Sequence, residues 1–153
     1  MSVKKDQKPA VNSHGFLLWQ AGNAWQRHVR KALSPTGMTN VQFILLDALN
    51  NLEANAEATS QARLAKVAQT DVMMTSKVLR TMEEKKWVIR KAHKSDGRSV
   101  ALMLTPEGKK VLSKSRAAIE KADKEFFKNL VSKPGKFAMN LIALIESTNK
   151  DQK

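Results

Sequence analysis

The segment from residue 60 to residue 105 constrains the fold of this chain most, because two short helical segments follow each other there almost without a gap. Ser60 and Asp71 stand where helix N-caps are expected, and only Gln69 and Thr70 separate the two predicted helices. Two helices joined by such a short turn form a helix-turn-helix unit. The inward-facing residues are predicted to be Leu64, Val67 and Ala68 in the first helix, and Thr75, Val78, Leu79 and Met82 in the second, which runs to about Lys86.

The apolar periodicity changes immediately after this unit. Residues 87–90 and 99–104 suit β-strands, and the Asp96-Gly97 pair between them is a strong hairpin-turn signal. In the second strand, Val100, Leu102 and Leu104 are expected on the buried face. A β-hairpin directly after a helix-turn-helix is a wing.

Helical segments flank this unit on both sides. Residues 16–33 are predicted to form a first helix, Thr39 to cap a second one, and residues 53–59 to form a polar loop. Thr105-Pro106-Glu107 opens a long helix whose apolar stripe extends to Leu130. Residues 133–135 interrupt it, and a last helix follows with one apolar face: Phe137, Leu141, Leu144 and Ile145. The predicted fold class is mainly α with a small β-hairpin wing, a winged helix-turn-helix between N- and C-terminal helices.

The net charge of +13 favours a polyanionic partner, chiefly nucleic acid. The charge is unevenly distributed along the chain. Residues 32–59 contain no Lys or Arg, whereas residues 60–98 contain ten basic residues against four acidic ones. The positive charge therefore falls on the predicted helix-turn-helix and wing.

Several functional classes find no support in the sequence. The 153 residues include no cysteine, which excludes disulfide scaffolds and thiolate chemistry and fits a cytoplasmic protein. The longest apolar runs have five residues, against about 20 for a membrane span. There is no Ser/His/Asp grouping and no glycine-rich phosphate loop, so we expect no enzyme, no catalytic residue and no cofactor. The histidines are too scattered to indicate a metal site: His14, His28 and His93.

The order of these elements and several fragments resemble the MarR family of bacterial regulators over about residues 16–145. The fragments are Gln61-Ala62-Arg63-Leu64-Ala65, Val78-Leu79-Arg80-Thr81-Met82-Glu83-Glu84-Lys85, Asp96-Gly97-Arg98 and Leu104-Thr105-Pro106-Glu107-Gly108. The resemblance implies a single MarR-like domain over residues 14–153, preceded by a mobile basic tail at residues 1–13. Residues 14–35 and 106–149 would then be dimerisation helices, and residues 38–105 the DNA-binding lobe.

Three positions depart from the family pattern. Val72 replaces a common proline at the start of the recognition helix, and Met73 and Met74 replace small polar residues, which puts any borrowed base preference in doubt. Lys86 replaces a glycine that usually follows Glu-Glu-Lys. A lysine held in the left-handed conformation costs roughly 1 kcal/mol relative to glycine, unless this helix end has a different shape.

The residues predicted to contact DNA lie on three elements. A recognition helix enters the major groove with its N-terminal part nearest the bases, so its outward face is predicted to contact bases or phosphates. That face carries Met73, Ser76, Lys77 and Arg80. Ser60 and Gln61 begin the preceding helix, where backbone N–H groups favour a phosphate, although Ser60 could serve as a cap alone. A solvated basic helix face is the alternative interpretation.

The wing supplies the remaining predicted DNA contacts. Arg98 is expected to enter the minor groove, Asp96 to hold Arg98 or the turn, and Lys94 to add positive charge. The alternative is an exposed hairpin with an incidental ion pair.

A second candidate site lies on the first helix. Trp19, Asn23 and Arg27 are four residues apart, and together they could hold an aromatic carboxylate, although dimer packing is the alternative role. A small aromatic or amphipathic effector is therefore a candidate partner beside double-stranded DNA and a second copy of the chain. We expect a ligand-responsive repressor that binds a pseudo-palindromic operator as a homodimer; the alternative is an architectural DNA-binding protein with little sequence preference.

Overall fold

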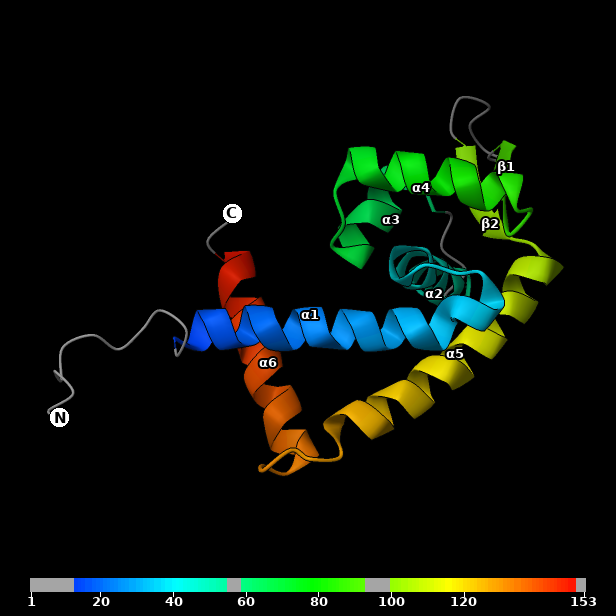
Figure 1. Cartoon of the computed structure of the whole chain (residues 1–153). Helices are drawn as coiled ribbons and strands as arrows, with labels where there is room; N and C mark the ends of the chain where they lie inside the picture. The colour runs from blue at the N-terminus through cyan, green and yellow to red at the C-terminus, as the bar shows by residue number, and fades with distance from the viewer. Residues whose placement is uncertain (1–12, 55–58, 93–99, 151–153) are drawn as a thin grey trace, which may run out of the picture.

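A computed structural model of the protein describes residues 13–54, 59–92 and 100–150. Its elements, shown in Figure 1, are α1 (His14–Leu33), the 3-10 helix η2 (Ser34–Thr36), α2 (Asn40–Ala54), α3 (Gln61–Ala68), α4 (Val72–Glu84), β1 (Val88–Ala92), β2 (Val100–Leu104), α5 (Pro106–Phe127) and α6 (Pro134–Lys150). The antiparallel hairpin pairs Val88 with Leu104 and Ala92 with Val100. The predicted fold class is confirmed.

Side-chain caps fix where the helices begin. The Thr39 hydroxyl accepts a hydrogen bond from the Gln42 N–H at 3.2 Å, and the Gln42 amide oxygen accepts one from the Thr39 N–H at 3.0 Å. This reciprocal pair satisfies two backbone donors that a helix start leaves free. Asp71 and Thr105 cap α4 and α5 in the predicted way. Ser13 caps α1, so that helix begins at His14, two residues before the predicted start.

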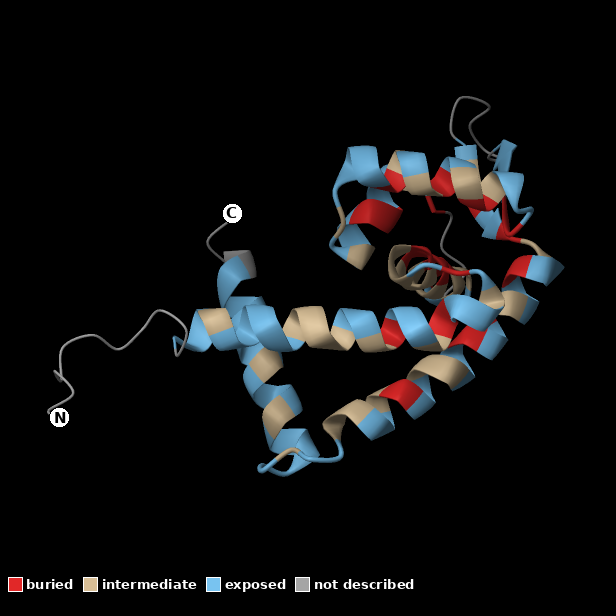
Figure 2. Ribbon diagram, in the orientation of Figure 1, coloured by how far each residue is buried: buried red, intermediate tan, exposed pale blue. Residues whose placement is uncertain are grey.

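Helix α2 lies at the centre of the hydrophobic core. It contacts α1, α3, α4, α5 and β2, and its leucines at positions 45, 46 and 49 are fully buried. Leu79 and Met82 of α4 pack into the same core, which also includes Trp87. Figure 2 shows the buried residues gathered on these elements. One face of α4 is thereby held against the core and the opposite face is left outward.

Three details of the predicted packing are wrong. Val67 is 48% exposed, because α3 packs through the side that carries Leu64 and Ala65. Val100 is exposed at the start of β2, whereas Leu102 and Leu104 are buried as predicted. Helix α5 ends at Phe127, so Leu130 lies beyond its apolar stripe.

The predicted polar loop at residues 53–59 is also wrong at both ends. Helix α2 continues to Ala54, and Thr59 is buried and forms an antiparallel bridge with Leu102. Residues 55–58, like residues 1–12 of the predicted tail, lie outside the described part of the chain.

The end of α4, the hairpin and the start of α5 meet at Thr105. Its hydroxyl donates to the Lys86 carbonyl at 2.6 Å and accepts from the Gly108 N–H at 2.9 Å. Its own N–H donates to the Trp87 carbonyl at 3.0 Å. Gly108 lies against that same carbonyl, where a Cβ atom would overlap the oxygen. This junction requires a glycine for steric reasons, and it fixes α5 relative to the end of α4.

The terminal helices carry much of the exposed apolar surface. In Figure 1, α5 leads away from the hairpin to α6, and α1 meets α5 at an angle. The Trp25 indole of α1 donates a hydrogen bond to the Asp123 carboxylate of α5 at 2.8 Å. Leu17, Leu18 and Trp19 of α1 are exposed, as are Met139, Ile142, Leu144 and Ile145 of α6. No helix in the described ranges is both long enough and apolar enough to cross a membrane.

Replacing Gly108 by alanine is expected to lower the free energy of unfolding by about 1–3 kcal/mol, the usual cost of overpacking. Urea unfolding at a fixed protein concentration measures the change. Gly135→Ala is the matched control, because a Cβ atom at position 135 meets no other atom within 4 Å. Equal stability of the two variants would contradict the steric role of Gly108.

Lys86 adopts the strained left-handed backbone conformation, with φ of +58°. Lys86→Gly should therefore raise the free energy of unfolding by up to about 1 kcal/mol, because glycine adopts this conformation without the Cβ penalty. Lys86→Ala removes the same charge but keeps Cβ, so it should give no such gain. A gain of the same size from both variants would show that charge, not backbone strain, limits stability at this position.

Candidate functional site

A short, tightly bonded turn sets the direction of α4. Gln69 adopts the left-handed conformation with φ of +52°, and the Thr70 N–H donates to the Ala65 carbonyl at 2.9 Å. The Thr70 and Thr75 hydroxyls lie 2.8 Å apart, and Thr75 also donates to the Asp71 carbonyl at 2.7 Å. Thr75 is fully buried, so this hydroxyl network is enclosed and anchors the first turn of α4.

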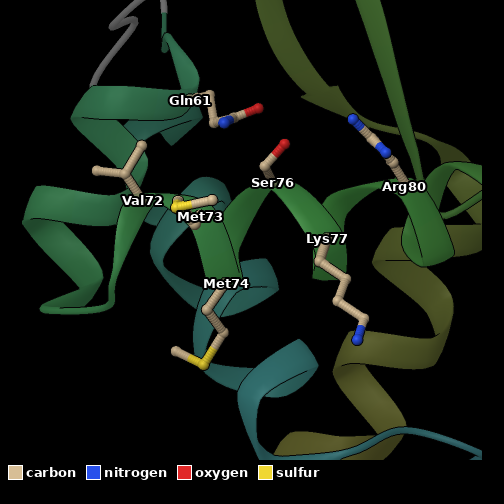
Figure 3. A pocket seen from close by; sticks show the side chains of 7 residues that line it. All are labelled: Gln61, Val72, Met73, Met74, Ser76, Lys77 and Arg80. Carbon is tan, nitrogen blue, oxygen red and sulfur yellow. The ribbon is translucent and has the colours of Figure 1, made fainter.

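The outward face of α4 brings the predicted recognition residues together. Met73 is 82% exposed, and Lys77 and Arg80 are also exposed. Figure 3 shows Ser76 and Arg80 pointing to one side together with Gln61 of α3, while Lys77 and Met74 point to the other side. Met73 lies between these two groups. The side chains line an open hollow of about 790 Å³ with Val72.

The two cations of this face are free to meet a ligand. The side chains of Lys77 and Arg80 make no hydrogen bond or ion pair with any residue in the described ranges. A cation without a protein partner keeps its full attraction for an anion. The outward face of α4 is therefore an open, positively charged surface with one large apolar side chain in it.

Arg90 of β1 joins three elements beside this face, and sequence analysis missed it. Its Nε donates to a Glu83 carboxylate oxygen at 2.7 Å, and its Nη2 donates to the Gln61 amide oxygen at 3.3 Å. Arg90 thus neutralises an acidic group near the cationic face and holds the Gln61 amide. Gln61 lies 29 residues before Arg90, and Glu83 lies seven residues before it on a different element, so no helix or strand spacing links the three. The single available signal was a cation in an exposed strand.

Ser60 has a defined local role. Its hydroxyl accepts a hydrogen bond from the Arg63 N–H at 3.2 Å, so it caps α3, as one of the two interpretations proposed. The predicted wing contacts Lys94, Asp96 and Arg98 lie outside the described residues. Strand β1 begins at Val88, shortly after α4 ends at Glu84, and β2 begins at Val100.

The predicted effector residues line one side of α1. Trp19 is 63% exposed and stacks on Phe16 with ring centroids 5.8 Å apart, Asn23 is half-buried, and Arg27 is exposed. Within the described ranges, no other side chain forms a hydrogen bond or an ion pair with any of these three side chains.

A more enclosed cavity lies one helical turn further along α1. It has a volume of about 480 Å³ and is lined by Gln26, Arg30, Ser34, Gly37, Met38, Thr39, Asn40, Val41 and Ile44. The Asn40 Oδ1 atom is buried there without a hydrogen-bond donor. Buried polar atoms are normally paired, so an unpaired acceptor in a residue that lines this cavity is unusual.

Comparison with known proteins places these features in a family context. Residues 38–100 match the MarR family. YdcH, an uncharacterized HTH-type transcriptional regulator of Bacillus subtilis, is 43% identical over 115 residues, which cover 75% of this chain and 78% of that protein. An HTH-type transcriptional repressor of Mycobacterium tuberculosis is 33% identical over 109 residues, which cover 71% of this chain and 76% of that protein.

The fold is also similar to that of solved structures. CouR from Rhodococcus jostii, solved with bound p-coumaroyl-CoA, superposes with a TM-score of 0.78 at 23% identity. The alignment covers 93% of this chain and 95% of that one. At this identity the similarity establishes the fold alone.

Proposed function

Because the chain belongs to the MarR family of transcriptional regulators, we propose that it is a sequence-specific, DNA-binding repressor. It acts in the cytoplasm as a homodimer on a pseudo-palindromic operator. The observation that carries this proposal is the outward face of α4, where the side chains of Lys77 and Arg80 have no partner among the described residues and lie beside the exposed Met73. The repressor name of the relative from M. tuberculosis supports the direction of regulation.

Helix α4 is the proposed recognition helix. It enters the major groove with the first two turns nearest the base edges. Arg80 and Lys77 can donate to guanine acceptors or to phosphates, Ser76 to either, and Met73 can contact thymine methyl groups. The buried opposite face of α4 keeps these side chains in a fixed relation to the core.

The start of α3 is the proposed phosphate contact. Helix N-termini favour anions through their free N–H groups and the helix dipole. Arg90 donates a hydrogen bond to the Gln61 amide oxygen, and the amide N–H groups of Gln61 are left to donate to DNA. Arg98, with Asp96 and Lys94, is proposed on the sequence alone as the minor-groove contact of the wing.

The terminal helices are the proposed dimer interface. One helix-turn-helix contacts only a few base pairs, and a two-fold dimer doubles the site with half-sites about one helical turn apart. The exposed apolar side chains of α1 and α6 supply the surface that such an interface buries. Residues 14–35 and 106–149 are accordingly assigned to dimerisation, and residues 38–105 to DNA binding.

A small aromatic or amphipathic acid is the proposed effector. The 480 Å³ cavity offers Arg30 for a carboxylate, Asn40 Oδ1 for a hydrogen-bond donor, and Ile44 for an apolar body. Its enclosure favours it over the triplet Trp19, Asn23 and Arg27, which is the second candidate. CouR, whose structure contains an aromatic acyl thioester, supports this ligand class.

Arg80→Ala tests the proposed recognition mode. On duplexes enriched from a random pool by the wild-type protein, the substitution should weaken the free energy of DNA binding by about 1–3 kcal/mol. It should also relax the base preference at one position of each half-site. Lys136→Ala in α6 removes the same charge away from α4 and serves as the control. An Arg80→Ala loss that is equal on all sequences would indicate a phosphate contact and favour the alternative, an architectural DNA-binding protein.

Light scattering at micromolar concentration tests the dimer. The expected mass is twice the 17.1 kDa of one chain. Ile142→Glu should shift the protein toward monomer with unchanged helical content, because Ile142 is exposed in the single chain and a buried interfacial charge is costly. Val131→Glu is the control, since Val131 is fully exposed outside the helices. A stable wild-type monomer would contradict the proposed interface.

A further inference from the structure

Met73 is the most exposed methionine in the described part of the chain. Its side chain is 82% exposed, next to 71% for Met139 in α6, whereas Met38 and Met82 are buried in the core. The exposed fractions of Met74 and Met103 are 40% and 37%. Because the full sequence contains no cysteine, methionine is the only side chain that can carry sulfur oxidation.

The surroundings of Met73 leave its side chain open to a small oxidant. Lys77 and Arg80 lie on the same outward face, and neither has an ion-pair partner in the described ranges. These cations do not concentrate hypochlorous acid, because it is uncharged, so the access of this oxidant depends on the exposure of Met73. The hollow beside Met73 is open to solvent, so a small oxidant reaches the sulfur atom without any rearrangement of the fold.

We propose that Met73 is a modification site at which oxidants of the hypohalous acid class switch off DNA binding. This inference rests on the proposed function of α4 as recognition helix. The thioether sulfur gives two electrons to hypochlorous acid, a sulfur–oxygen bond forms, and chloride and a proton are released. Chlorine is reduced from +1 to −1, and the sulfur atom becomes a sulfoxide, so no further reactant is needed.

The chemical change acts on the contact that Met73 makes with DNA. A thioether is apolar and suits the thymine methyl group, whereas a sulfoxide is polar, wider and chiral. The oxidised side chain must be desolvated at the base edge without gaining a partner there, which weakens binding. Methionine sulfoxide reductases reverse the change, so the site returns to its binding state. Bound DNA covers the sulfur atom and slows its oxidation.

The test treats the full-length protein with increasing equivalents of hypochlorous acid and measures two quantities. Peptide mass spectrometry, with fragment spectra that separate Met73 from Met74, gives the order of oxidation. Fluorescence anisotropy on the enriched operator gives the affinity of each sample. We expect Met73 to be oxidised first, its oxidation to be slowed by operator, and the affinity to fall about tenfold, the loss typical of one wrong base pair. The two sulfoxide reductases together should restore it.

Two variants assign the effect to one residue. Each is judged by the ratio of its affinities before and after oxidation, since Met73→Leu has an operator affinity of its own. The ratio should fall to about one in Met73→Leu and stay at the wild-type value in Met139→Leu. A wild-type ratio in Met73→Leu, or earlier oxidation of another methionine with full loss of binding, would overturn the proposal. Failure of the unoxidised protein to prefer its operator would instead overturn the proposed function.

Discussion

The hydrogen bonds of Thr105 to the end of α4 hold the rest of this structure in place. One hydroxyl joins the Lys86 carbonyl to the first turn of α5, and the Thr105 N–H joins the Trp87 carbonyl to the end of β2. The recognition helix, both ends of the hairpin and the long helix toward α6 therefore share one small junction. Gly108 leaves no space for a side chain between the first turn of α5 and the Trp87 carbonyl. Thr105 therefore ties the first turn of α5 to the segment that follows α4.

Three acidic residues of the described part of residues 38–105 are paired with cations away from Lys77 and Arg80. Asp47 pairs with Arg116 at 2.7 Å, Glu53 pairs with Lys109 at 3.5 Å and accepts from the Leu104 N–H, and Glu83 pairs with Arg90. Such exposed or half-exposed pairs contribute little stability each. Their larger effect is on the electrostatic surface, because they neutralise three carboxylates, one of them on α4, without engaging Lys77 or Arg80.

Local features of the sequence predicted most of the fold, because caps and apolar spacing act within one or two turns. Thr39, Asp71 and Thr105 begin their helices as expected, and Leu79 and Met82 face the core. The exposure of Val67 and the burial of Thr59 depend on which neighbour each element meets, and spacing alone does not contain that information. The link from Arg90 to Gln61 depends on three elements meeting in space. The outward position of Met73, Lys77 and Arg80 was predictable from the spacing. The lack of partners for the two cationic side chains within the described ranges was not.

The most direct test of the central claim is the ratio of two affinities at physiological salt. The wild-type protein is measured on an operator enriched from a random pool and on a scrambled duplex of the same length and composition. For a sequence-specific regulator we predict a preference of about 10³ or more. The charge of +13 makes some binding to both duplexes certain, so the ratio is the informative quantity. Affinities that agree within about tenfold on a correctly folded dimer would contradict specific recognition through α4.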